Sequence, residues 1–230
     1  MKASGARLRA LAFVLPALVS FACSGDDPPA DDAKPAAAGT SQAPSPSTES
    51  PGEAAAGAYR RFVIALRRDD ARSAEVLMTR PAVRYLNGLR NVTAHAGAGA
   101  IEGLSPYEKL VVAVLRTEND PDLVEGVSTA LFLELMLGGN VVTVPSIEVR
   151  SVSVDGARAK LDVAGWGPDV LCELEGTAWR VDGAAVLAEA NDAIATLARS
   201  QGVGEEAAIL DLATRLTGQT VTSAVWRKPS

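Results

Sequence analysis

The chain has 230 residues, a formal net charge of −6, two cysteines and a single histidine. An acidic chain lacks the basic face that a nucleic-acid binder needs, so we exclude that class of partner. Two Cys and one His cannot supply the four ligands of a Cys/His zinc site, and two Cys are too few for a disulfide-stapled small domain. We therefore expect no metal, no cofactor and one folded domain with tails.

Residues 1–22 have the pattern of a secretory signal peptide. Three basic residues precede an apolar stretch over residues 10–22. That stretch is too short for a stop-transfer helix, and Pro16 would interrupt a membrane-spanning one. The segment therefore predicts export of the protein.

The end of this segment, Ser20-Phe21-Ala22-Cys23, resembles the lipobox of bacterial lipoprotein signals, in which a small residue precedes a cysteine. The resemblance implies cleavage before Cys23 and attachment of lipid to its thiol. An ordinary signal peptidase, which prefers small residues at the first and third positions before the cut, would cleave the same bond. We expect a lipid-anchored protein of the bacterial cell envelope, facing the periplasm or the outside.

Residues 23–53 are expected to form a disordered linker. After Cys23, residues 24–53 contain six Pro, six acidic residues, one Lys and no aromatic residue. Such a stretch cannot bury enough apolar surface to offset its chain entropy. We interpret it as an acidic spacer that holds one folded domain, residues 54–230, away from the membrane surface.

The first half of that domain has the period of helices. Four apolar residues fall at i, i+3, i+4 and i+7, namely Tyr59, Phe62, Val63 and Leu66. Asp69-Asp70 is expected to end this helix and to cap the next, and Pro81 fits the first turn of a third. Arginines 60, 61, 67 and 68 lie mostly off the apolar face.

Two further helix starts follow. Ser105-Pro106-Tyr107-Glu108 predicts a capping box. Asp120-Pro121 predicts a helix that runs on to Gly138-Gly139. The Gly/Ala-rich residues 94–104 are expected to be a loop.

The second half changes to the alternation of β-strands. Val152 and Val154 alternate in the opposite phase to Ile147 and Val149, which indicates a β-bulge near Arg150-Ser151. Turns at 155–156 and 175–176 divide the following residues into strands that end at residue 181. The sequence therefore predicts an antiparallel meander of about four strands.

Helical periodicity returns over residues 184–230, and the tail from Val221 to Trp226 is expected to pack back on the core. Helices followed by a meander predict an α+β fold, with the N-terminal helices on a curved antiparallel sheet and a C-terminal helical extension.

Residues 54–183 resemble the NTF2-like (cystatin-like, cone-shaped) superfamily, especially its exported bacterial lipoprotein members. The resemblance rests on the opening helix over residues 58–66 with its Asp69-Asp70 end, and on the hairpin over residues 174–182, which is similar to the family's Gly-x-Trp-x-Val strand. It implies a cone-shaped domain with a pocket, in which some relatives use an Asp to abstract a proton. Residues 184–230 have no counterpart in that family.

Individual candidates for chemistry are few. Cys172 alternates with apolar residues along a strand and is flanked by Glu173 and Glu175, so we expect a core cysteine and not a nucleophile. A disulfide between Cys23 and Cys172 is the alternative if Cys23 carries no lipid. His95 is expected to be an exposed loop residue.

The acids Asp69, Asp70, Asp155 and Asp182 stand at predicted helix ends and turns, where Asp is favoured for capping. Trp166, between two glycines at a strand end, either anchors a partner or covers the open end of the core. It is the one candidate contact with a partner or a pocket.

We therefore expect a non-enzymatic binding or accessory module, attached to membrane lipid through Cys23, with an envelope protein as a further partner class. The alternative is a small-molecule-binding protein, or a lyase or isomerase, that uses an NTF2-like pocket. A third hypothesis is a structural envelope protein that self-associates through its C-terminal helices. The sequence does not set the oligomeric state.

Overall fold

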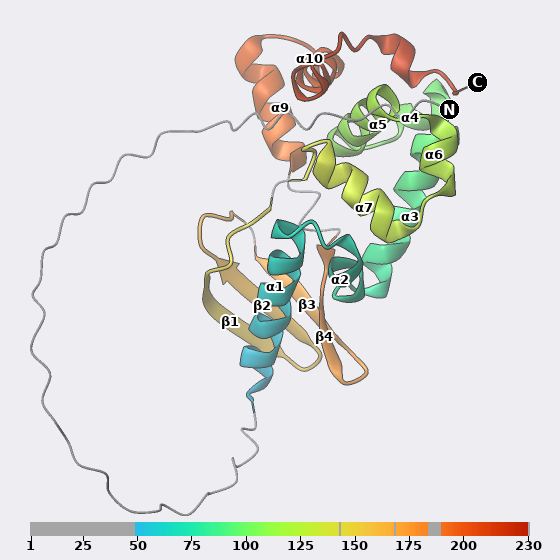
Figure 1. Cartoon of the computed structure of the whole chain (residues 1–230). Coiled ribbons are helices and arrows are strands. Elements are labelled where there is room, and N and C mark those ends of the chain that lie inside the picture. Colours follow the sequence, from blue (N-terminus) through green and yellow to red (C-terminus); the bar gives the residue numbers. More distant parts are fainter. Residues whose placement is uncertain (1–48, 143, 168, 184–189, 230) are drawn as a thin grey trace, which may run out of the picture. The chain divides into compact units, whose positions relative to one another are not determined.

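The structure is a computed structural model that describes residues 49–142, 144–167, 169–183 and 190–229 (Figure 1). The predicted signal peptide, Cys23 and the predicted linker as far as residue 48 lie outside the described residues. The described chain begins with seven helices: α1 (Pro51–Arg67), α2 (Ala71–Val76), α3 (Arg80–His95), α4 (Ala98–Glu102), α5 (Pro106–Glu118), α6 (Pro121–Gly126) and α7 (Thr129–Gly138). Four strands and the C-terminal helices follow: β1 (Val149–Asp155), β2 (Arg158–Val163), β3 (Val170–Glu175), β4 (Ala178–Val181), α9 (Ala190–Gln201), α10 (Glu205–Thr217) and the 3₁₀ helix η1 (Ser223–Trp226).

The four strands form one antiparallel sheet in the order β1-β2-β3-β4, which confirms the predicted α+β fold with a four-strand meander. The predicted bulge is present, because the register of β1 against β2 shifts between Val149 and Ser151. Gly156 follows β1 with a φ of +57°, in the left-handed region that suits glycine at a tight turn.

Helix α1 packs against all four strands, as Figure 1 shows. Its predicted apolar face is buried, with Tyr59, Phe62, Val63 and Leu66 at most 1% exposed. A capping box between Ser50 and Glu53 starts the helix at Pro51. Residues 51–53 therefore belong to α1, whereas the prediction placed them in the linker.

Two further boundaries differ from the prediction. The Gly/Ala-rich stretch expected to be a loop contains the end of α3 and the short helix α4. The helix predicted from Asp120-Pro121 to Gly138-Gly139 is broken at residues 127–128 into α6 and α7. Ser128 Oγ accepts the Leu131 N–H at 3.2 Å and caps α7, while the Arg90 guanidinium donates to the Val127 carbonyl, which a continuous helix would use internally.

Helix α5 lies among α3, α7, α9, α10 and η1 (Figure 1). All six residues from Leu110 to Leu115 are buried, so this helix is the centre of the helical layer. The tail packs back as predicted, with Val221 and Trp226 buried. Residues 184–189, the beginning of the stretch predicted to be helical, lie outside the described residues. Within the described ranges, no helix combines the length and apolarity needed to cross a bilayer.

Candidate functional site

The structure places the predicted candidates apart from one another. Cys23 lies outside the described residues. Trp166 is half-buried against the hydrophobic core, and its backbone N–H donates to the Val163 carbonyl at 3.1 Å. His95 ends α3 instead of lying in a loop, and its Nε2 is 3.5 Å from a carboxylate oxygen of Glu125. The side chains of His95 and Glu125 are both exposed.

Cys172 is a core cysteine, as expected. Its side chain is fully buried, and its Sγ lies 4.0 Å from the Ala55 carbonyl on α1. Burial raises the pKa of the thiol to about 12, so it is neutral at physiological pH. Asp70 has the capping role that was predicted, since its Oδ1 accepts the Ser73 N–H at 3.0 Å, and this bonding lowers its pKa.

The layer between α1 and the sheet is packed with side chains. Tyr59, Phe62 and Val63 fill it from the helix side. The Tyr59 hydroxyl donates to the Ser146 carbonyl at 2.6 Å, and burial raises its pKa to about 12. Among the described residues, no group of three or more His, Cys, Asp or Glu is placed to hold a metal ion.

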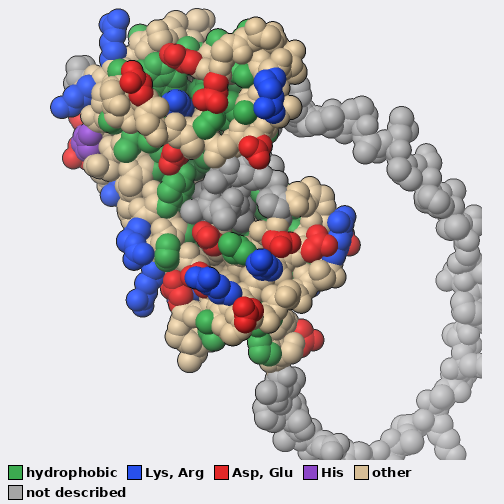
Figure 2. Space-filling view, turned by 180° about the vertical axis from the view of Figure 1, so that it is seen from behind, with side chains coloured by type: hydrophobic (Ala, Val, Ile, Leu, Met, Phe, Trp, Pro, Cys, Tyr) green, Lys and Arg blue, Asp and Glu red, His purple; other side chains and the backbone are tan. Residues whose placement is uncertain are grey.

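The charges of the folded domain are strongly segregated along the chain. Residues 54–95 contain eight Arg, no Lys and three acidic residues, a formal charge of +5. Residues 96–230 contain ten basic and nineteen acidic residues, a formal charge of −9. Blue side chains gather along the left edge of Figure 2, at mid-height, with a few green and red ones among them. An acidic protein thus has a basic region on its surface.

Three hollows meet at Val76, which is 61% exposed at the end of α2. Their volumes are about 600, 330 and 520 Å³. We call this surface the basic groove and define it by Val76 and the six arginines that line the hollows, Arg61, Arg68, Arg72, Arg80, Arg84 and Arg180. Four acidic residues, Glu49, Asp70, Glu75 and Glu175, also line them.

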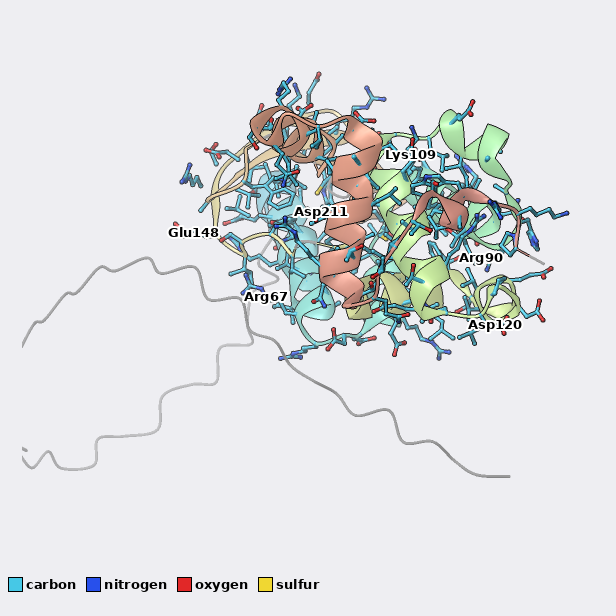
Figure 3. All side chains as sticks on the ribbon, turned by 90° about the horizontal axis from the view of Figure 1, so that it is seen from above. Arg67, Arg90, Lys109, Asp120, Glu148 and Asp211 are labelled. Carbon is cyan, nitrogen blue, oxygen red and sulfur yellow. The ribbon has the colours of Figure 1, made fainter. Side chains whose placement is uncertain are left out.

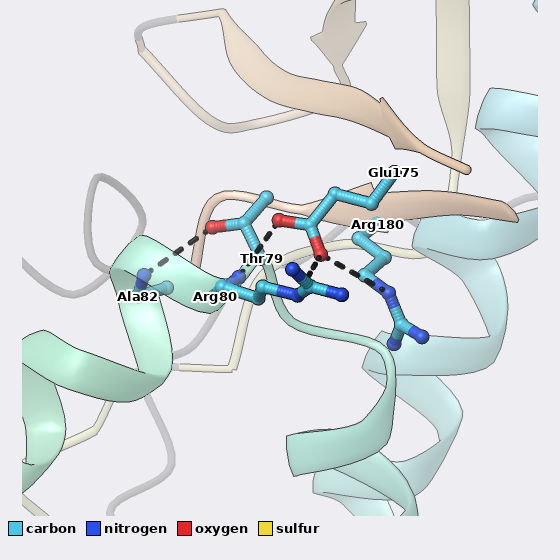
Figure 4. Close-up of polar contacts among 5 residues, drawn as sticks. All are labelled: Thr79, Arg80, Ala82, Glu175 and Arg180. Atoms are coloured by element: carbon cyan, nitrogen blue, oxygen red, sulfur yellow. Dashed lines mark hydrogen bonds and ion pairs between the residues drawn. The ribbon is translucent and has the colours of Figure 1, made fainter.

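Glu175 organises one wall of the basic groove (Figure 4). Its Oε1 accepts the backbone N–H of Arg80 at 2.8 Å, at the N-terminus of α3. Its Oε2 lies 3.7 Å from Arg80 Nε and 3.5 Å from Arg180 Nε. The positive end of the helix dipole favours a carboxylate at this position. Thr79 completes the start of α3, because its Oγ1 accepts the Ala82 N–H at 3.3 Å.

Five of the other arginines in residues 54–95 form two groups with different roles. Arg67 and Arg90, which lie well apart in the view of Figure 3, donate to the carbonyls of Pro145 and Val127 and serve the fold. Arg61, Arg68 and Arg84 belong to the groove, and within the described residues no hydrogen bond or ion pair engages their guanidinium groups. These three side chains are therefore available to a ligand.

The chain matches no family model, no curated protein and no solved structure. The resemblance to the NTF2-like superfamily therefore stays a prediction.

Sequence analysis missed the basic groove for a clear reason. Its residues come from α1, α2, α3 and β4, and only the fold brings Arg180 beside Arg80. The signal that was present is the count of eight Arg against three acids within residues 54–95 of an otherwise acidic domain.

Proposed function

We propose that this protein is a lipid-anchored, non-enzymatic binding module of the bacterial cell envelope, with an NTF2-like domain that binds an anionic partner in the basic groove. The attachment rests on the signal pattern of residues 1–22 and on Cys23. The binding role rests on one observation: three arginines whose guanidinium groups have no partner in the described residues line hollows that the exposed apolar side chain of Val76 also lines.

The chemistry of the groove favours carboxylate or phosphate groups. A guanidinium presents a planar set of N–H donors that matches either anion in a bidentate manner, and such charge-assisted hydrogen bonds are among the stronger ones. The acidic remainder of the domain repels the same partner, so the charge distribution also orients it. The exposed side chain of Val76 in the basic groove adds an apolar contact.

A binding role, in preference to catalysis, is supported by two features of the interior. The layer between α1 and the sheet is filled by large side chains such as Tyr59 and Phe62. The thiol of Cys172 is neutral and buried beneath α1. Accessible chemistry in the described chain therefore concentrates on the surface.

The anchor is tested by the mass of the mature protein isolated from the membrane fraction of a bacterial host. We expect an N-terminus at Cys23 that carries a diacylglyceryl group, and a Cys23→Ser variant that lacks the lipid. Recovery of the wild-type protein with an unmodified Cys23, or with Met1 still present, would reject the anchor.

The binding role is tested with fluorescein-labelled poly-L-glutamate and the full chain, by fluorescence anisotropy. An Arg61→Ser/Arg84→Ser variant should bind about ten-fold more weakly or worse, because two charge-assisted contacts are lost. The matched control is Arg199→Ser/Arg215→Ser on α9 and α10, which lowers the net charge equally and should bind as the wild type does. Equal losses in both variants would indicate a general charge effect and would contradict the groove.

A further inference from the structure

The outer edge of β4 is only partly covered. β4 is the last strand of the sheet, so one of its edges faces away from β3. At Val181 this edge is occupied, because the Val181 N–H donates to the Leu77 carbonyl at 2.8 Å and the Val181 carbonyl accepts the Thr79 N–H at 2.9 Å. The segment over residues 77–79 thus pairs with the end of the strand, in parallel at Met78.

The backbone of Trp179 points to the same edge. Backbone groups alternate sides along a strand, so the N–H and C=O of a residue two positions before Val181 face the same way as those of Val181. Neither group has a hydrogen-bond partner within the described residues. An unpaired strand edge is a template for another strand. The hydrogen bonds between residues 77–79 and the edge of β4 do not extend to Trp179.

The surface of the basic groove is hollowed beside this edge. The hollow of about 330 Å³ is lined by Trp179 together with Arg61, Val76 and Leu77. Glu49 is the one acidic residue among the described residues that line this hollow. Arg84 lines the adjoining hollow, which shares Val76 and Arg180 with this one.

We propose that an extended acidic peptide segment of a partner protein adds to the free edge of β4 at Trp179. Its backbone pairs with the N–H and C=O of Trp179, which gives affinity independent of sequence. Its acidic side chains lie against the unpartnered Arg61 and Arg84, and an apolar residue between them contacts Val76. This inference rests on the proposed function, since it specifies the ligand of the same groove.

The test uses two fluorescein-labelled peptides and the full chain. One is Glu-Val-Glu-Val-Glu-Val-Glu, and the other has the same sequence with every backbone nitrogen methylated. Both carry four glutamate side-chain carboxylates, but the methylated peptide cannot donate a backbone hydrogen bond. Binding to the wild type, to Arg61→Ser/Arg84→Ser and to Arg199→Ser/Arg215→Ser is measured by anisotropy, with thermal unfolding as a check that the variants fold.

We expect the unmethylated peptide to bind the wild type at least about ten-fold more tightly than the methylated one, because strand addition draws its affinity from the backbone. The loss of Arg61 and Arg84 should weaken binding, and the control variant should not. Equal affinity for both peptides, with dependence on Arg61 and Arg84, would overturn strand addition and leave the anionic groove standing.

Two other outcomes distinguish a failure of the proposed binding function from a failure of the strand-addition proposal. If neither peptide binds and poly-L-glutamate does not bind, the proposed binding function fails together with this inference. If neither peptide binds but vesicles of phosphatidylglycerol bind in a manner that depends on Arg61 and Arg84, the groove recognises a membrane surface and the peptide proposal is overturned.

Discussion

Helices α1 and α5 start with the same capping motif but differ in how much of their surface is buried. Each begins with Ser-Pro-x-Glu, and in each the Ser and Glu form a capping box. α1 buries one face on the sheet and turns a face of arginines to solvent, whereas α5 is enclosed along Leu110–Leu115. The same local signal thus sets where each helix begins, while the surrounding elements determine whether its polar residues are buried or exposed to solvent.

Arginine shows this difference most clearly. Arg116 on α5 donates all five of its N–H groups to backbone carbonyls at 2.6–3.0 Å. The acceptors are the carbonyls of Val92, Thr93, Ala96, Val225 and Arg227. It therefore joins the end of α3 to the C-terminal tail. Arg61 on α1 donates to no group in the described chain. The first is a structural residue and the second is free to bind.

The largest expected effect comes from replacing Arg116 with an uncharged side chain. The same replacement at Arg61 is the comparison. Arg116→Met should lower the free energy of unfolding by about 3 kcal/mol or more, because five carbonyls, four of them in partly buried hydrogen bonds, lose a charged donor at once. Arg61→Met should change it by no more than about 0.5 kcal/mol. Denaturant unfolding checks both. Arg116→Lys, which keeps the charge with fewer donors, should fall between them, and equal effects of the two Met variants would refute the distinction.

The second prediction concerns alkaline pH on the α1 side. The pKa of Cys172 is raised from 9.0 to about 12 and that of Tyr59 from 10.0 to about 12, both mainly by burial. Between pH 9 and 12 each group keeps its proton in the folded state, whereas the unfolded chain loses it. The contribution of these groups to the free energy of unfolding is therefore complete below pH 9 and declines as pH rises toward 12.

One such group gives a slope of about 1.4 kcal/mol per pH unit within that window. Urea unfolding at pH 8 to 11 should therefore show a shallower decline for Cys172→Ala than for the wild type, although the variant starts from a lower stability. Parallel declines for the two proteins would mean that the thiol does not contribute.

The smallest expected effect separates two buried tyrosines. The Tyr59 hydroxyl on α1 has the Ser146 carbonyl as its acceptor, so Tyr59→Phe should lower the free energy of unfolding by about 1 kcal/mol. The Tyr107 hydroxyl on α5 is buried without a hydrogen-bond partner among the described residues. Tyr107→Phe should therefore be neutral or stabilising. Thermal unfolding checks the pair, and a larger loss for Tyr107→Phe would contradict the assignment.

Features set by short-range chemistry could be predicted from the sequence. The capping box at Ser105, the cap at Asp70 and the phase change that marks the bulge between Val149 and Ser151 are local patterns, and the structure confirms all three. The break at residues 127–128 was not predicted: the Ser128 cap is a local signal that the prediction did not use, whereas the bond from Arg90 to the Val127 carbonyl joins residues distant in the sequence.

The candidate site was predictable only in part. The clustering of arginine was visible, but the pairing of Glu175 with Arg80 and Arg180 and the unpaired backbone groups of Trp179 depend on strand order and register. Trp166, the aromatic residue that the sequence favoured, packs against the core and is only half-buried. The lipid on Cys23 stays a prediction.

The most direct test of the basic groove as a strand-addition site is the hydrogen exchange of the Trp179 amide, measured residue by residue by NMR in the full chain with and without Glu-Val-Glu-Val-Glu-Val-Glu. The account predicts that saturating peptide slows exchange at Trp179 by about ten-fold or more, while amides of α9 and α10 are unchanged. Unchanged exchange at Trp179 under saturation, or protection confined to other elements, would contradict it.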